Sequence, residues 1–113
     1  MKKSDKKIDN TLREALTEAC DVALENIYGF KWLTHRINYN AFPESLLILC
    51  VFETNAMLSN AQTSHQDAYL CDVIEEKLKR SGISIRHLKQ HIHFDTEENC
   101  NHEHDGNWKA RLK

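Results

Sequence analysis

The chain has 113 residues, 41% of them hydrophobic and 28% charged, which is typical of one globular domain and argues against wholesale disorder. Its net charge of -2, from 15 basic and 17 acidic side chains, excludes a bulk attraction to nucleic acid or to an anionic membrane. No apolar stretch approaches transmembrane length, and the four cysteines form no Cys-x-x-Cys pair. We therefore expect a cytoplasmic protein with reduced, buried thiols and no membrane contact.

The first predicted element is a long amphipathic helix. Residues 1–8 are rich in lysine, and we expect them to form a flexible basic arm ahead of a single domain at residues 9–105. Apolar residues then recur at intervals of three and four positions from Ile8 to Ile27, which predicts one buried helical face. Gly29 is a natural end for this helix.

Two strands are expected next. Alternating apolar residues between Phe30 and Tyr39 predict a half-covered strand. Residues 46–52 are apolar throughout, which is typical of a strand buried on both faces. The short link between the two segments favours an antiparallel pair.

The second half of the chain predicts further elements. In chain order they are a loop at 59–66, a helix at 67–80, a short helix at 83–88, a strand at 90–95, a helix beginning at Thr96, and a C-terminal tail at 106–113. The order is therefore helix, strand, strand, helix, strand, helix. It predicts an α+β fold, a two-layer domain in which helices pack on a three-stranded mixed sheet. If the second and third strands lie parallel in the sheet, they and the helix between them form a right-handed crossover.

Two acidic residues follow strands that this arrangement makes parallel. Glu53 follows the second strand and Asp95 ends the third, so both carboxylates are expected at the same edge of the sheet, where they could hold a divalent metal ion. The alternative is that Phe-Glu-Thr and Phe-Asp-Thr are simply the ends of strands followed by helix or turn starts.

The densest group of chemically active residues lies near the C-terminus. Cys100 and His104 are four residues apart and would share a helical face, while His91 and His93 would share one face of the preceding strand. Together they could supply one thiolate and three imidazoles to zinc or another divalent metal. The spacing matches no standard zinc motif, so an exposed histidine-rich surface is the alternative. A metal-dependent hydrolase is the enzyme class that such a site would allow.

Other catalytic patterns are missing from the sequence. There is no Gly-x-Ser-x-Gly elbow, and the three glycines are isolated, so neither a phosphate-binding loop nor a dinucleotide fingerprint is present. We therefore expect a non-catalytic regulatory or protein-interaction domain. Trp32, Phe42 and Trp108 lie outside the clear core stripes and are the candidate anchors for a protein partner, and a homodimer remains open.

Several segments resemble a known group of sequences. Residues 30–35 (FKWLTH), 42–46 (FPESL), 94–98 (FDTEE) and 106–108 (GNW) resemble a family of small uncharacterised gamma-proteobacterial proteins, sometimes labelled Fis-family transcriptional regulators. That label implies a DNA-binding helix-turn-helix at the C-terminus. The element order is also similar to that of the second type of KH domain, an RNA binder, but its Gly-x-x-Gly clamp is missing. Basic residues at both chain ends would then contact phosphates: Lys2, Lys3, Lys6, Lys7, Lys109, Arg111 and Lys113.

Overall fold

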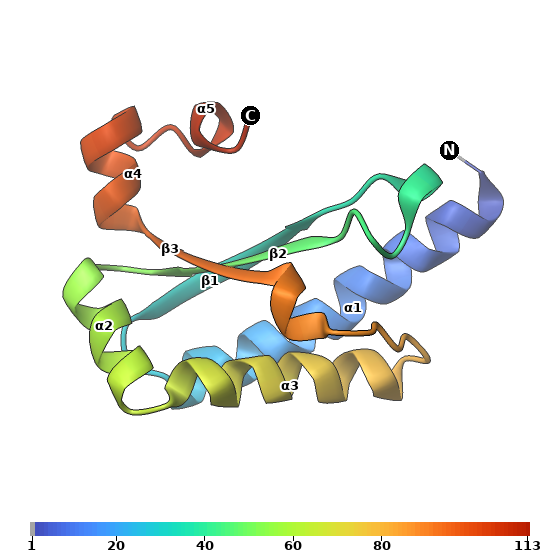
Figure 1. The fold of residues 1–113 in the computed structure, drawn as a ribbon, viewed down its shortest axis with the longest axis horizontal. Helices are drawn as coiled ribbons and strands as arrows, with labels where there is room; N and C mark the ends of the chain where they lie inside the picture. Colours follow the sequence, from blue (N-terminus) through green and yellow to red (C-terminus); the bar gives the residue numbers. More distant parts are fainter. Residues whose placement is uncertain (1) are drawn as a thin grey trace.

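The computed structural model describes residues 2–113 and has two long helices beneath a three-stranded sheet (Figure 1). The strands are β1 (Phe30–Arg36), β2 (Leu47–Phe52) and β3 (Ile92–Thr96), and they lie in the order β1-β2-β3. β1 pairs with β2 antiparallel and β2 pairs with β3 parallel, which confirms the predicted α+β fold and its mixed sheet. No helix in the described residues is long and apolar enough to cross a membrane.

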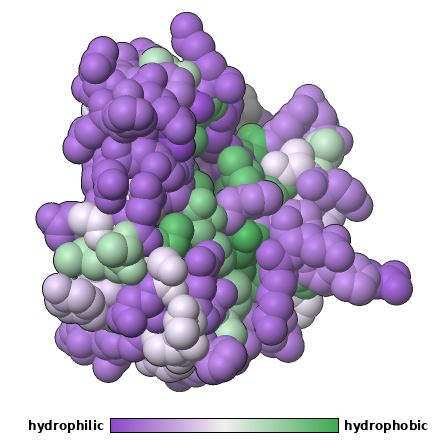
Figure 2. Space-filling view, turned by 60° about the vertical axis from the view of Figure 1, so that its left-hand side comes forward, coloured by the Kyte–Doolittle hydropathy of each residue, from purple (hydrophilic) through white to green (hydrophobic). Residues whose placement is uncertain are grey.

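The helices α1 (Lys3–Asn26) and α3 (Gln66–Arg80) cover one face of the sheet and run in opposite directions (Figure 1). They pack there because their apolar stripes meet the alternate side chains of the strands. On β2 these are Ile48, Cys50 and Phe52, all fully buried in the core. The face shown in Figure 2 is mostly hydrophilic, with hydrophobic residues in a central band and in smaller groups near its edges.

The opposite face of the sheet is covered by the end of the chain. Leu49 and Val51 point to this face because side chains alternate along a strand, and Val51 is fully buried. The segment above them consists of α4 (Glu97–His104) and the one-turn α5 (Trp108–Arg111). Residues 106–113 were predicted to be a tail, but they form an integral part of the domain instead.

Five other predicted boundaries are wrong. α1 begins at Lys3, so residues 3–8 are helical rather than a flexible arm, with the Lys6 N–H donating to the Lys2 carbonyl; Met1 lies outside the described residues. The predicted loop is mostly a helix, α2 (Asn55–Thr63), capped by Thr54. Its apolar stripe is short because only Ala61 is buried, so periodicity gave a weak signal. The short helix predicted at 83–88 is absent, since residues 83–87 form no helix. A 3₁₀ turn occupies Leu88–His91, where the strand predicted at 90–95 would begin. The first strand was predicted to reach Tyr39, but β1 ends at Arg36.

The different environments of two apolar residues predict different stability costs. We expect Phe52→Ala to destabilise the fold by about 3 to 5 kcal/mol, because Phe52 is fully buried and its removal leaves a cavity. Leu24 also fits the sequence pattern of the buried stripe but is 51% exposed, so Leu24→Ala should cost less than about 0.5 kcal/mol. Urea unfolding followed by tryptophan fluorescence measures both, and similar costs would contradict the described packing.

Candidate functional site

The two predicted strand-end carboxylates do not meet. Val51 pairs with Asp95 and Phe52 with Thr96, so Glu53 lies two positions beyond Asp95 along the sheet. The threonines that follow are helix caps: Thr54 Oγ1 accepts from the Met57 N–H at 3.1 Å, and Thr96 Oγ1 accepts from the Asn99 N–H at 3.0 Å. The repeated Phe-acid-Thr pattern is therefore a strand end followed by a helix start.

Asp95 is paired with the C-terminal segment instead. The Arg111 guanidinium donates to both Asp95 oxygens, at 2.6 Å from Nε and 3.1 Å from Nη2. Arg111 also donates to the Glu103 carboxylate, and its Nη1 lies 3.2 Å from His104 Nδ1. Both members of the Asp95–Arg111 pair are largely buried, with side chains 16% and 14% exposed. Arg111 is thus a structural cation, and this position corrects the prediction that it contacts phosphates.

The two tryptophans belong to the same contact region. Their rings pack edge to face with centroids 4.9 Å apart, and both indole N–H groups donate to the Glu97 carboxylate. Trp32 pairs in register with Val51, which in turn pairs with Asp95, so these three form a row across the sheet beneath α5. We call Trp32, Asp95, Glu97, Trp108 and Arg111 the C-terminal clasp. Its function is to hold the chain end over the second sheet face.

Phe42 lies apart from the tryptophans. It precedes β2 and packs against the main core, whereas Trp32 pairs near the other end of that strand. All three aromatic residues are half-buried. The predicted partner-binding residues therefore form no common surface.

The predicted metal ligands are separated by the fold. Cys100 is fully buried, and burial raises the pKa of its thiol. His91 Nδ1 lies 2.8 Å from the Leu46 carbonyl, His93 is exposed, and His104 contacts Arg111. Within residues 2–113, no group of three or more His, Cys, Asp or Glu side chains is arranged to hold a metal ion. The geometry thus gives no support to the predicted zinc site.

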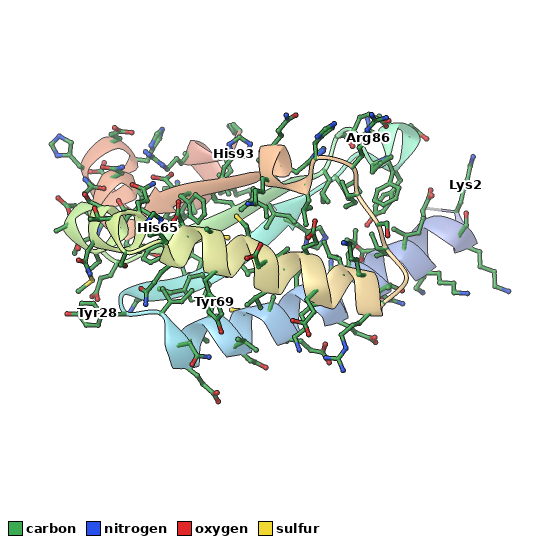
Figure 3. All side chains as sticks on the ribbon, turned by 60° about the horizontal axis from the view of Figure 1, so that its bottom comes forward. Lys2, Tyr28, His65, Tyr69, Arg86 and His93 are labelled. Atoms are coloured by element: carbon green, nitrogen blue, oxygen red, sulfur yellow. The ribbon has the colours of Figure 1, made fainter. Side chains whose placement is uncertain are left out.

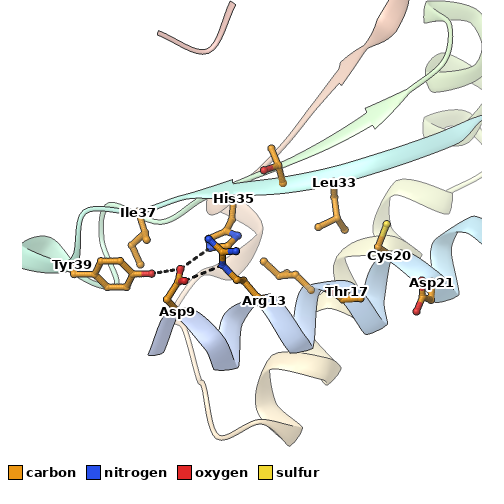
Figure 4. A pocket seen from close by; sticks show the side chains of 11 residues that line it. Asp9, Arg13, Thr17, Cys20, Asp21, Leu33, His35, Ile37 and Tyr39 are labelled. Atoms are coloured by element: carbon orange, nitrogen blue, oxygen red, sulfur yellow. Dashed lines mark hydrogen bonds and ion pairs between the residues drawn. The ribbon is translucent and has the colours of Figure 1, made fainter. Parts of the chain in front are cut away.

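A groove of about 540 Å³ lies between α1 and β1 (Figure 4). At one end of the groove the Tyr39 hydroxyl donates a hydrogen bond to the Asp9 carboxylate. Asp9 also forms an ion pair with Arg13, whose Nε lies 2.9 Å from Asp9 Oδ2, and His35 Nε2 lies 3.6 Å from Asp9 Oδ1. The bond from Tyr39 lowers the pKa of Asp9, while burial and the same bond raise the pKa of Tyr39 to about 12. These groups satisfy one another, so the cluster fastens α1 to the end of the sheet. Sequence reasoning missed it because its members are far apart in the chain.

The helical layer has strongly segregated charge. Nine Lys or Arg and two Asp, a net charge of +7, lie in two segments. These are residues 2–13, at the start of α1, and residues 77–86, at the end of α3 and in the loop after it. Residues 14–28 and 66–76 contain eight Asp or Glu and no Lys or Arg, a net charge of -8. Because α1 and α3 are antiparallel, like charges gather at the same end (Figure 1). We call these the basic end and the acidic end.

The fold and these surfaces define a small α+β domain with a basic and an acidic end. A scan of protein-family models, a search of curated proteins and a search of solved structures found no match to this chain.

The clasp predicts a measurable effect of Arg111. Arg111→Met keeps most of the alkyl stem but leaves the largely buried Asp95 without its cation, so we expect a loss of about 2 kcal/mol in unfolding free energy. Lys109→Met is the matched control because Lys109 is exposed, and it should change stability by less than about 0.5 kcal/mol. Urea unfolding measures both, and an equal midpoint for Arg111→Met and the parent would rule out a stabilising clasp.

Acid should weaken the same contact. Burial raises the pKa of Asp95, but the hydrogen bonds from Arg111 and from the Thr96 N–H outweigh burial and hold that pKa below its usual range. The unfolded chain, in which an Asp protonates near pH 3.9, therefore binds more protons as the pH falls through about 4, so the fold loses stability there. Asp95→Asn should be less stable than the parent at pH 6 and show a smaller further loss between pH 5 and 3. Parallel pH curves from urea unfolding would contradict this assignment.

Proposed function

We propose that the protein binds nucleic acid, without a strong sequence preference, through phosphate contacts at the basic end. The observation that carries the proposal is the net charge of +7 on residues 2–13 and 77–86, which lie at one end of a chain whose total charge is -2. Figure 3 shows Lys2 and Arg86 at this end, on elements far apart in the sequence. A local cluster of cations attracts a polyanion even when the whole chain is slightly acidic.

The cations of the basic end are available for such contacts. Lys2, Lys3, Lys6 and Lys7 are exposed on the first two turns of α1, and Arg86 is exposed in the loop after α3. Lys79 and Arg80 make only exposed ion pairs, at 3.7 Å, with Glu75 and Glu76. Pairs of this kind contribute little energy, so phosphates can replace the carboxylates at small cost.

Duplex nucleic acid fits this surface better than a single strand. Single-strand binders stack bases on exposed aromatic rings. In the described part of the chain, the exposed large hydrophobic residues are Leu24, Tyr28 and Tyr69, and none belongs to the basic end. Contacts there would therefore be made to the phosphate backbone.

This proposal keeps part of the sequence-based hypothesis and moves the rest. Lys2, Lys3, Lys6 and Lys7 remain phosphate ligands, and residues 77–86 join them. α5 is a single helical turn docked on the sheet, with Arg111 paired to Asp95, so it offers no free recognition helix. Lys109 and Lys113 are exposed but lie outside the basic end.

Binding should depend steeply on salt and on these particular cations. We expect a fluorescently labelled DNA duplex to bind at low salt, and the affinity to fall by roughly 10³-fold or more between 50 and 200 mM salt if six or more phosphates are contacted. The variant Lys3→Gln/Lys6→Gln/Lys7→Gln/Arg86→Gln should bind weakly, with a salt slope smaller by about one for each lost contact. Fluorescence anisotropy measures both quantities.

A charge-matched control variant separates the basic end from net charge. Lys31→Gln/Lys89→Gln/Lys109→Gln/Lys113→Gln removes four exposed cations outside the basic end, and this variant should bind nearly as well as the parent. No binding of the parent at low salt would refute the proposal. Equal losses in the two variants would refute the assignment to the basic end.

A further inference from the structure

The acidic end carries three exposed large hydrophobic residues. Leu24, Tyr28 and Tyr69 are 51%, 70% and 42% exposed, and they are the exposed large hydrophobic residues of the part of the chain that the structure describes. Leu24 is in the last turns of α1, Tyr28 follows that helix, and Tyr69 is in the first turn of α3. Figure 3 shows the two tyrosines at the same end of the helical layer. We call these three residues the tyrosine patch.

Exposed carboxylates without ion-pair partners lie near the residues of the tyrosine patch on the same two helices. Asp21 and Glu25 are exposed on α1 next to Leu24, and Asp72 is exposed on α3 one turn after Tyr69. None of these three is in an ion pair among the described residues. Tyrosine is enriched among the residues that dominate binding energy at protein interfaces. The patch thus combines aromatic anchors with a rim of negative charge.

The charges decide which occupant fits. A twofold contact between two copies through this patch would bring two ends of charge -8 together, which like-charge repulsion disfavours. The basic end of a second copy has the right sign, but the exposed large hydrophobic residues described above are all outside it. It therefore offers little apolar surface to cover the tyrosines.

We infer that the tyrosine patch binds a basic amphipathic helix of a partner protein. The apolar stripe of that helix would cover Leu24, Tyr28 and Tyr69, while its Lys and Arg side chains would contact the carboxylates of Asp21, Glu25 and Asp72. This site is at the opposite end of the helical layer from the proposed nucleic-acid surface. The protein would then connect a basic partner with nucleic acid.

The test uses a synthetic helix as the probe. A peptide of about 14 residues, built from Leu and Lys in an amphipathic helical pattern, is titrated into isotopically labelled full-length protein. We expect one-to-one binding in the micromolar range, with NMR shift changes centred on Leu24, Tyr28 and Tyr69. A peptide of the same composition, scrambled to remove the apolar stripe, should bind at least about tenfold more weakly.

Three variants divide the energy between apolar and charged contacts. Tyr28→Ser/Tyr69→Ser should weaken binding at least about tenfold at any salt concentration, because the anchors are lost. Glu25→Gln/Asp72→Asn should weaken binding mainly at low salt. Glu44→Gln/Asp105→Asn removes two exposed carboxylates elsewhere and should leave binding unchanged. All six substituted positions are exposed, and circular dichroism verifies the fold of each variant.

Each alternative result overturns the inference. Equal affinity for the amphipathic and scrambled peptides, or equal losses in all three variants, would mean nonspecific attraction to an acidic protein. Shift changes at the patch that depend on protein concentration without peptide would identify a second copy as its occupant. Because DNA anisotropy reports on the basic end alone, failure of this inference is distinguishable from failure of the proposed nucleic-acid binding.

Discussion

The fold depends on one constraint, that both faces of β2 must be covered. Phe52 and Val51 point to opposite faces of this central strand, and each is fully buried. The α1–α3 layer covers the Phe52 face. The Val51 face is covered by the chain end, which the Asp95–Arg111 ion pair and the two tryptophans hold in place. A strand that is apolar on both sides thus requires a domain with covers above and below the sheet.

That requirement explains why several acidic and sulfur-containing residues near the C-terminus are engaged in structural contacts. Asp95 neutralises the cation of the C-terminal segment, Glu97 accepts from both indoles, and Cys100 faces the interior. Polar groups that leave water need partners, and these groups supply partners to one another. The chemistry that remains accessible is on the outer surface of the helical layer, where charge is divided between two ends.

The sequence predicts the charge blocks that make up the basic end and the acidic end, but it does not predict how these blocks are arranged in space. Each half of α1 and α3 has a clear charge bias, so the blocks can be read directly along the chain. That two blocks of like charge lie at the same end cannot be read from the sequence. Residues 2–13 and 77–86 become neighbours only because α1 and α3 pack in opposite directions. The same limit affected the predicted metal ligands: His91 lies in the 3₁₀ turn before β3 and not on the strand with His93, and Cys100 is buried in the interior. Leu24 was misassigned because it lies at the edge of the apolar stripe: Ala23 and Ile27 beside it are buried, whereas Leu24 faces solvent.

The sequence by itself determined the class of fold, because hydrophobic periodicity and the apolar run at 46–52 depend on local geometry. It also favoured the antiparallel pairing of the first two strands, because the link between them is short. The strand order and the parallel pairing of β2 with β3 came from the tertiary structure. Only the tertiary structure decided which polar residues are committed to stability and which remain at the surface. Ion pairs such as Asp95–Arg111, and the joining of two basic segments into one end, depend on distances between residues that no local pattern encodes.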